Sequence, residues 1–328
     1  MFEKDMIAID ISNEVITILV GNKLKITSGT TIKTPKDAFD GDSVKNVQAI
    51  AEVIRGFLRT TKTKARDVLF SVRGEDIITR HMEIPMVQED ALLDSVEFEL
   101  RQFMGDRLDE YYFDYEIVGS EKNAGSGKCH ALIVAVEKSK IDSYMALGHE
   151  LKLNVKGIDL YANAVARVIG NLKSSATKGI KTIGVIDIGV ENSAIVITEW
   201  GKLVLDKYRS LEDMSMYDKT PLDSIDLTEV KEYDEQTEME RSLRDEINEY
   251  NSLIQYYTSG KVRKNLDRIY VIGSASNIRG IEQYVSVNLN SRVAKAPTFS
   301  ELRNSVKNAK SIYLKDYMVA YGLLLRRE

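Results

Sequence analysis

The sequence has few of the residues that carry covalent or metal chemistry. Its 328 residues include one cysteine, Cys129, and three histidines. A single cysteine excludes an intramolecular disulfide, and together with three scattered histidines it cannot supply a Cys/His zinc site. Both features are typical of a protein from a reducing compartment.

The sequence also lacks a large excess of charge of one sign and long runs of apolar residues. The 45 basic and 50 acidic residues give a formal charge of −5, which offers no electrostatic footprint for nucleic acid. No apolar stretch approaches the roughly 20 residues of a membrane helix, and the charged residues 1–5 do not resemble a signal peptide. We therefore expect a soluble, cytoplasmic protein without a nucleic-acid partner, which reaches a membrane only through another protein.

The pattern of apolar residues predicts an α/β protein of about two domains. We expect strands at residues 7–11, 15–20, 68–72, 77–82, 111–118, 129–136, 155–159, 183–188, 196–198 and 268–273. We expect helices at residues 43–60, 89–103, 139–151, 160–172, 239–257, 281–289 and 313–325. The polar stretch 174–179 is the expected boundary between two halves, and the acidic stretch 211–238 is expected to be a loop.

Each half begins with a strand that ends in an aspartate. The apolar run 183–188 leads into Asp187-Ile188-Gly189, and a weaker copy near the N-terminus reads Asp10-Ile11-Ser12-Asn13. Backbone N–H groups of such a tight turn bind phosphate oxygens, and the carboxylates hold Mg²⁺ through water. A simpler interpretation is that each aspartate only caps the turn that follows it. Two copies at matching places favour the ligand-binding interpretation.

A third turn, Gly273-Ser274-Ala275, follows the expected strand 268–273 and precedes a helix. Together the three turns resemble those of the actin, sugar-kinase and heat-shock ATPase superfamily, which has a duplicated fold related to ribonuclease H. The resemblance implies ATP and Mg²⁺ as cofactors, with Asp10 and Asp187 around the metal ion. The nucleotide-binding residues that it implies are Asp10, Ser12, Asn13, Asp187, Gly189, Glu246, Gly273, Ser274 and Ala275. Glu246 is equally well explained as a solvated charge on a helix.

Within the superfamily, an ordered set of motifs resembles the PilM family of type IV pilus assembly proteins, which is related to the cell-division protein FtsA. The motifs are Ile9-Asp10-Ile11, Val72-Arg73-Gly74 through Ile84-Pro85, Tyr111 to Val118, Leu132 to Val136, Ile158-Asp159, Val185 to Gly189, Tyr256-Tyr257, Val271 to Ala275 and Ala320-Tyr321-Gly322-Leu323. The implied subdomains are 1A (1–85 and 155–176, with the helix 313–326), an inserted 1C (86–154), 2A (177–209 and 267–312) and 2B (210–266).

Three departures from the family pattern fall where nucleotide chemistry would be done. Ser12 stands where relatives carry a glycine, Tyr161-Ala162 replaces Glu-Pro, and Gly273-Ser274 replaces Gly-Gly. The glutamate of relatives is placed to orient attacking water, so we expect little or no hydrolysis. Because Gly189 is retained in the second half, we expect nucleotide binding to depend more on Asp187 than on Asp10.

The resemblance implies a cytoplasmic scaffold or adaptor of a pilus machine, peripheral to the inner face of the plasma membrane. Its implied partner is the N-terminal tail of a PilN-like bitopic membrane protein, with pilus motor ATPases and a second copy of the chain as further partners. The candidate tail-binding residues are Val72, Arg73, Ile78, Leu92, Val96, Phe98 and Tyr112, although core packing also explains each one. The alternatives are an active ATPase or phosphotransferase and an FtsA-like filament-forming protein.

Overall fold

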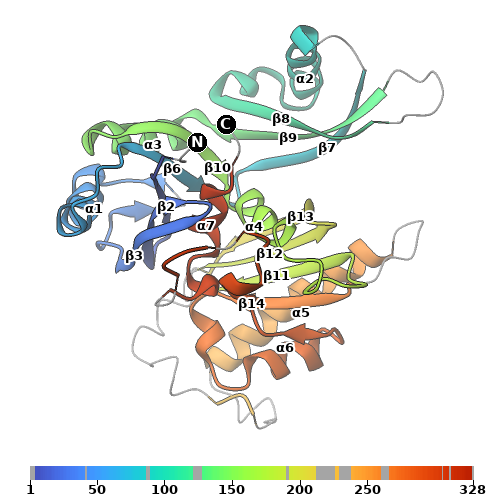
Figure 1. Ribbon diagram of the computed structural model, residues 1–328. Coiled ribbons are helices and arrows are strands. Elements are labelled where there is room, and N and C mark those ends of the chain that lie inside the picture. The colour runs from blue at the N-terminus through green and yellow to red at the C-terminus, as the bar shows by residue number, and fades with distance from the viewer. Residues whose placement is uncertain are drawn as a thin grey trace.

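Two five-stranded sheets with the same strand order form the body of the protein (Figure 1). The computed structural model describes residues 4–40, 43–85, 89–120, 128–189, 192–211, 226–228, 238–259, 266–304, 306–309 and 312–326. Most of the expected acidic loop 211–238 therefore lies outside the described residues. Among the described helices, none is long and apolar enough to cross a bilayer.

The first sheet has the order β10-β6-β1-β2-β3. The second sheet, read from the corresponding edge, has the order β15-β14-β11-β12-β13. In each, a three-stranded antiparallel meander is followed by a strand parallel to its first strand. The first sheet consists of β1 (Met6–Ile11), β2 (Val15–Asn22), β3 (Lys25–Lys33), β6 (Asp67–Val72) and β10 (Asn154–Leu160). The second consists of β11 (Thr182–Ile188), β12 (Asn192–Glu199), β13 (Lys202–Ser210), β14 (Arg268–Ile272) and β15 (Val293–Ala294). The chain is thus duplicated, as the two aspartate turns predicted.

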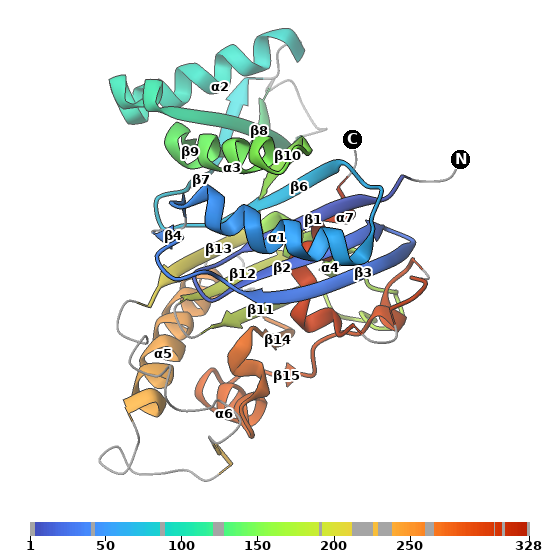
Figure 2. The same ribbon diagram turned by 90° about the vertical axis from the view of Figure 1, so that its left-hand side faces the viewer.

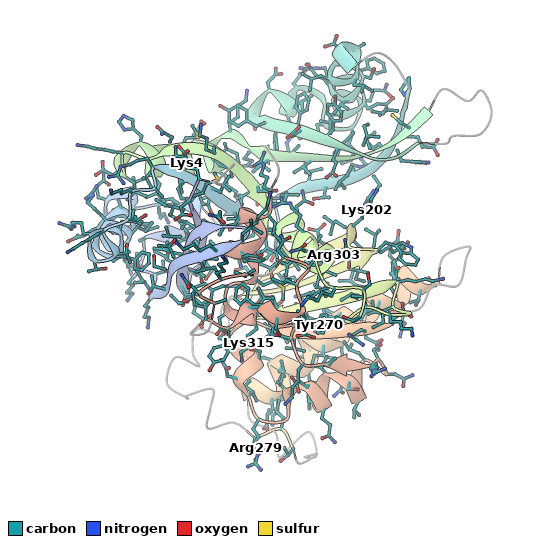
Figure 3. The ribbon with its side chains drawn as sticks, in the orientation of Figure 1. Lys4, Lys202, Tyr270, Arg279, Arg303 and Lys315 are labelled. Atoms are coloured by element: carbon teal, nitrogen blue, oxygen red, sulfur yellow. The ribbon has the colours of Figure 1, made fainter. Side chains whose placement is uncertain are left out.

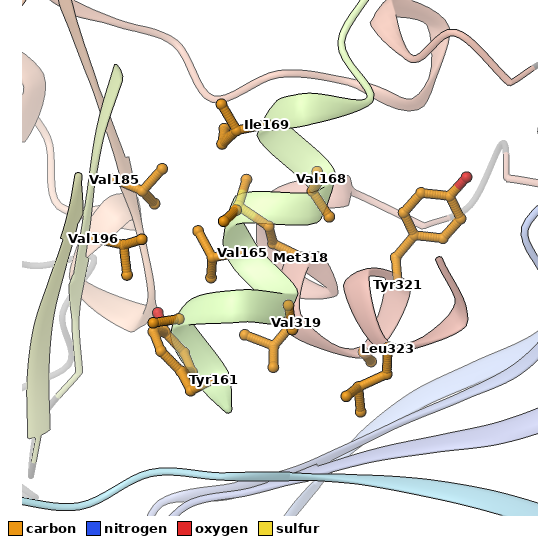
Figure 4. Packing of buried hydrophobic residues seen from close by; sticks show 14 of the residues in the cluster. Tyr161, Val165, Val168, Ile169, Val185, Val196, Met318, Val319, Tyr321 and Leu323 are labelled. Carbon is orange, nitrogen blue, oxygen red and sulfur yellow. The ribbon is translucent and has the colours of Figure 1, made fainter. Parts of the chain in front are cut away.

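Two helices, α4 (Tyr161–Gly170) and α7 (Met318–Leu324), fill the space between the sheets. Figure 4 shows side chains of both helices between Val185 and Val196 on one side and the first sheet on the other. The helices approach closely because Gly322 has no side chain, and a Cβ there would lie 2.0 Å from the carbonyl oxygen of Ala164. The C-terminal helix is shorter than expected, since a 3₁₀ turn (Leu314–Asp316) precedes it.

The outer faces of the sheets are covered by two pairs of helices (Figures 1 and 2). The first sheet packs on α1 (Val47–Thr61) and α3 (Lys138–Glu150), and the second packs on α5 (Glu238–Thr258) and α6 (Ile281–Asn288). Helix α1 begins later than expected because the side chain of Asn46 caps it, accepting a hydrogen bond from the Ala49 amide at 3.0 Å. A two-stranded ribbon precedes it, made of β4 (Phe39–Asp40) and β5 (Ser43–Val44).

A small unit lies at the end of the molecule opposite α5 and α6 (Figures 1 and 2). It contains a three-stranded sheet and one helix: β7 (Ile78–Pro85), α2 (Glu89–Met104), β8 (Tyr111–Ser120) and β9 (Lys128–Glu137). The boundaries of this unit, judged by its packing, differ from those of the expected insert 86–154. Strand β7 pairs with β9, and α3 packs into the core of the first half through Tyr144 and Leu147.

Candidate functional site

The two aspartate turns face each other across a cavity of about 430 Å³ between the halves. Of the residues expected to bind nucleotide, those lining it are Asp10, Ser12, Asp187, Gly189, Gly273 and Ser274. Asn13, Glu246 and Ala275 do not line it. Glu246 is buried and accepts hydrogen bonds from Ser193 and Arg209, and Ala275 lies in the core of the second half. Lys315, labelled in Figure 3, lines the cavity from the segment that leads into α7.

Asp10 is paired with an arginine from the neighbouring strand of its own sheet. Arg73 follows β6 directly, and its guanidinium donates to the Asp10 carboxylate, which also accepts from the Ser71 hydroxyl. The Arg73 side chain is 4% exposed and lies over the Tyr161 ring, 4.4 Å from its centroid. Burial lowers the pKa of Arg73, but the charge of Asp10, the neighbouring Tyr208 and Tyr161 and the hydrogen bond to Asp10 together outweigh burial, and the net pKa is raised. Arg73 is therefore a fixed cation between the halves.

Asp187 takes its hydrogen bond from the other half. The hydroxyl of Tyr161, the first residue of α4, donates to Oδ2 of Asp187 at 2.5 Å. Burial and the charge of Asp187 raise the pKa of Tyr161, so the phenol keeps its proton and remains a donor at neutral pH. Burial also raises the pKa of Asp187, an effect that Arg73 opposes. This hydrogen bond directly joins the two halves.

A third acidic residue, Glu14, crosses from the first half to the glycine turns of the second. Ser274 donates to its carboxylate at 3.3 Å, and a Cβ built on Gly189 would lie 3.1 Å from the same oxygen. Gly273 has a φ of +83°, and a Cβ there would lie 2.2 Å from Oδ1 of Asp187. The small residues of these turns thus allow carboxylates of the protein itself to approach the backbone closely.

The arrangement does not fit a magnesium ion held through water by Asp10 and Asp187. Such an ion needs carboxylate oxygens that can accept from its water shell. The guanidinium of Arg73 binds Oδ1 of Asp10, the hydroxyl of Tyr161 binds Oδ2 of Asp187, and a divalent ion beside the buried cation Arg73 would be repelled. Among the described residues, no group of three Asp, Glu, His or Cys side chains is placed to hold a metal ion.

A second cavity, of about 210 Å³, lies where the turn after β6 meets α4 and β13. Its lining is Val72, Arg73, Gly74, Glu75, Ile77, Thr79, Leu160, Tyr161, Ala162, Asp206, Lys207 and Tyr208. Burial raises the pKa of Asp206 to about 6, although Lys207 opposes this shift. The two cavities share Arg73, so this residue separates a site between the halves from one beside the small unit.

The sequence matches the family described as type IV pilus assembly protein PilM over residues 8–216, well over half of the chain. The chain belongs to this family. A search of curated proteins found no match.

Solved structures place the PilM-family chain in the actin-like fold. A structure described as the PilM-PilN type IV pilus biogenesis complex matches with a TM-score of 0.78 and 15% identity over 98% of both chains. MreB 5 of Spiroplasma citri bound to AMPPNP matches with a TM-score of 0.51 and 11% identity over 98% of this chain and 95% of that one. The ethanolamine utilization protein EutJ from Carboxydothermus hydrogenoformans matches with a TM-score of 0.51 and 12% identity over 99% of this chain and 90% of that one. The predicted fold and family are confirmed.

The residues that the PilM resemblance assigned to the partner do not gather at one place. Val96 is fully buried in the core of the small unit, and Leu92 packs against that core. Phe98 and Tyr112 are 63% and 47% exposed. The buried Val72 and Arg73 line the second cavity, whereas Ile78 packs with the small unit. No pattern in the sequence indicates that Arg73 pairs with Asp10, because the two residues are 63 positions apart.

Proposed function

We propose that this chain is a cytoplasmic scaffold of a type IV pilus assembly machine, and that it docks the cytoplasmic N-terminal tail of a PilN-like membrane protein. Membership of the PilM family and the likeness over 98% of both chains to the structure described as a PilM-PilN complex carry the proposal. Docking a membrane protein would place the chain at the inner face of the plasma membrane. Motor ATPases and a second copy of the chain are further proposed partners.

The proposed docking place is the second cavity, together with the turn after β6 that forms one wall. Lys140, 2% exposed, donates to the carbonyl oxygen of Arg73 at 3.2 Å and pairs with Asp76. The turn is therefore fixed before a partner arrives. A disordered tail loses entropy when it binds, and a preorganised site limits that loss to the tail itself.

The lining of this cavity indicates the chemistry of the tail. Val72, Ile77 and Leu160 offer apolar contact for an anchor side chain. The partly desolvated carboxylate of Asp206 would gain from a cation, and Glu75 adds a second negative charge. We propose that the tail presents an apolar anchor followed by a basic residue.

Nucleotide turnover has no part in this proposal. ATP bound between the halves would contact Ser12, Gly189 and Gly273, but it would meet Arg73 and Glu14 at the places of its metal ion and phosphates. Tyr161, which stands where relatives carry a glutamate, keeps its proton and donates to Asp187. It therefore cannot accept a proton from attacking water.

Thr79, which lines the cavity from β7, offers the test. A synthetic peptide of the PilN-like tail is titrated by calorimetry against the intact protein and its Thr79→Trp and Thr79→Val variants. Thr79→Trp fills the cavity and should weaken binding by about tenfold or more, whereas Thr79→Val keeps the size and should change it little. Phe98→Ala tests the exposed face of α2. If Phe98→Ala alone weakens peptide binding, the docking site lies on α2. If the intact protein does not bind the peptide, the docking function is refuted.

A further inference from the structure

The cleft between the halves contains both kinds of charge that a magnesium nucleotide would bring. A cation, Arg73, is bound to Asp10 and stacks on Tyr161, which in turn binds Asp187. An anion, Glu14, lies against the turns that carry Gly189 and Ser274. The sequence resemblance implies a metal ion beside Asp10 and Asp187 and phosphates at the turns, and in this structure Arg73 and Glu14 lie beside those residues.

We propose that this chain closes the cleft with its own side chains, so that closure requires no magnesium nucleotide. Arg73 stands in place of the metal ion and acts through Tyr161, which donates to Asp187, and Glu14 stands in place of a phosphate. The proposal does not rest on the docking function: Arg73 and Tyr161 also line the docking cavity, but Asp10, Glu14 and Asp187 line only the other cavity, and both tests are made there.

Arg73 is suited to this role because it cannot leave or lose its charge. Its guanidinium keeps its proton at every physiological pH, unlike a lysine or histidine in the same place. Its backbone is held by Lys140, its side chain by Asp10, and its flat face by the Tyr161 ring. Metal binding at Asp10 would require this buried arginine to move into solvent or to remain beside a divalent ion, and both are unfavourable.

Glu14 completes the arrangement on the anionic side. Its carboxylate accepts from Ser274, a residue of the turn that the family resemblance assigned to nucleotide binding. A phosphate at the same turns would meet like charge at short range in a partly desolvated cleft, which opposes its binding. Since Glu14 belongs to the first half and Ser274 to the second, the contact also holds the cleft closed.

The metal is tested directly with Mn²⁺, whose bound fraction is measured by electron paramagnetic resonance with and without ATP. We expect the intact protein and its Asp187→Asn variant to bind the same amount of Mn²⁺ under both conditions, because no ion is held between the halves. A Mn²⁺ ion that the intact protein binds and Asp187→Asn loses would overturn the proposal. This comparison needs no substitution of the buried arginine.

The anion is tested with Glu14→Gln, which removes the charge and keeps the size. ATP affinity is measured by calorimetry in the presence of magnesium and in the presence of EDTA. We expect Glu14→Gln to bind ATP at least about tenfold more tightly than the intact protein, the scale of one removed like-charge contact in a desolvated site. A folded Glu14→Gln protein with unchanged ATP affinity would overturn the role of Glu14. The tail peptide enters neither experiment, so failure here leaves the docking function untouched.

Discussion

The same place in the two sheets carries different chemistry. Strand β6 runs parallel to β1, and β14 runs parallel to β11. After β6 comes Arg73, whose side chain reaches Asp10 in its own half. After β14 comes Gly273, which has no side chain and lets Oδ1 of Asp187 approach its backbone. The two copies of the backbone thus carry different aspartates: Asp10 is neutralised by Arg73 of its own half, whereas Asp187 needs a partner from the other half.

This difference decides where the two halves are joined. Asp10 needs nothing from the second half, because Arg73 and Ser71 already bind it. Asp187 receives the hydroxyl of Tyr161 from the first half, and Glu14 and Glu75 extend two further contacts across, to Ser274 and to the amide of Ser210. The second half is therefore the one whose turn depends on closure.

The largest expected effect on stability comes from removing Arg73, the cation that neutralises Asp10 within the first half. Arg73→Ala should lower the free energy of unfolding by about 3–5 kcal/mol, because it leaves Asp10 as a largely buried charge without its cation. Urea denaturation measures the loss. The matched control is Arg55→Ala, which breaks the exposed pair of Arg55 with Glu150 at 2.8 Å and should cost about 0–1 kcal/mol. Equal losses in the two variants would remove the distinction between the halves.

Gly273→Ala should have the next largest effect and acts on the second half. We expect it to destabilise the protein by about 2–4 kcal/mol, since the new Cβ would overlap Asp187 and the residue has a positive φ. Gly56→Ala in α1 is the control: nothing lies within 4 Å of its Cβ, and a helical alanine should stabilise by about 0.5–1 kcal/mol. Thermal unfolding of both variants measures the contrast, and a stable Gly273→Ala would show that the close approach is dispensable.

Tyr161→Phe isolates the hydrogen bond that joins the halves. It keeps the ring under Arg73 and removes the donor to Asp187, so we expect a loss of about 1–2 kcal/mol in unfolding free energy. Tyr112→Phe removes an exposed hydroxyl that donates to Asp142 at 3.3 Å and should cost much less. A loss no greater than that of Tyr112→Phe would contradict a role for Tyr161 in closure.

The smallest effect concerns the third strands of the two meanders, where Asp206 pairs with Val196 as Gly29 pairs with Leu19. The folded pKa of Asp206 is about 6 against an ordinary 3.8. The folded state therefore binds more protons between these values, and its stability falls as pH rises from about 4 to about 6. Because Asp206 is partly exposed, we expect Asp206→Asn to stabilise the protein by only about 1 kcal/mol at pH 7 and not at all below pH 4. Parallel pH series of urea unfolding measure this, and a pH-independent difference would exclude Asp206 as the cause.

Patterns local in the sequence predicted most of the fold. The β-branched runs before Asp10 and Asp187 form the first strands of the two sheets, and the spacing of apolar residues predicted the helices to within a few positions. The cavity between the halves is lined by Ser12, Gly189 and Gly273, which the family resemblance assigned to nucleotide binding. The predictions of strands and helices succeeded because strand, turn and helix preferences are set by neighbours along the chain.

The boundaries of the small unit and the members of the site were harder to predict. Residues 78–85 have a strand pattern that fits either sheet, and only pairing with β9 assigns them to the small unit. In the same way, α3 is amphipathic whichever core receives it, and the position of Tyr144 and Leu147 against the first sheet decides the matter. Asn13 and Glu246 were expected at the cavity, but their distance from it depends on how whole elements pack.

The sequence by itself determined a duplicated α/β chain with an aspartate at the end of each leading strand, because alternation and turn chemistry are local properties. Tertiary structure alone decided what each aspartate binds. Arg73 is 63 residues from Asp10, Tyr161 is 26 from Asp187, and Glu14 is 260 from Ser274. Charges and hydrogen bonds act through space over a few ångströms, so their partners are fixed only when the two halves have come together.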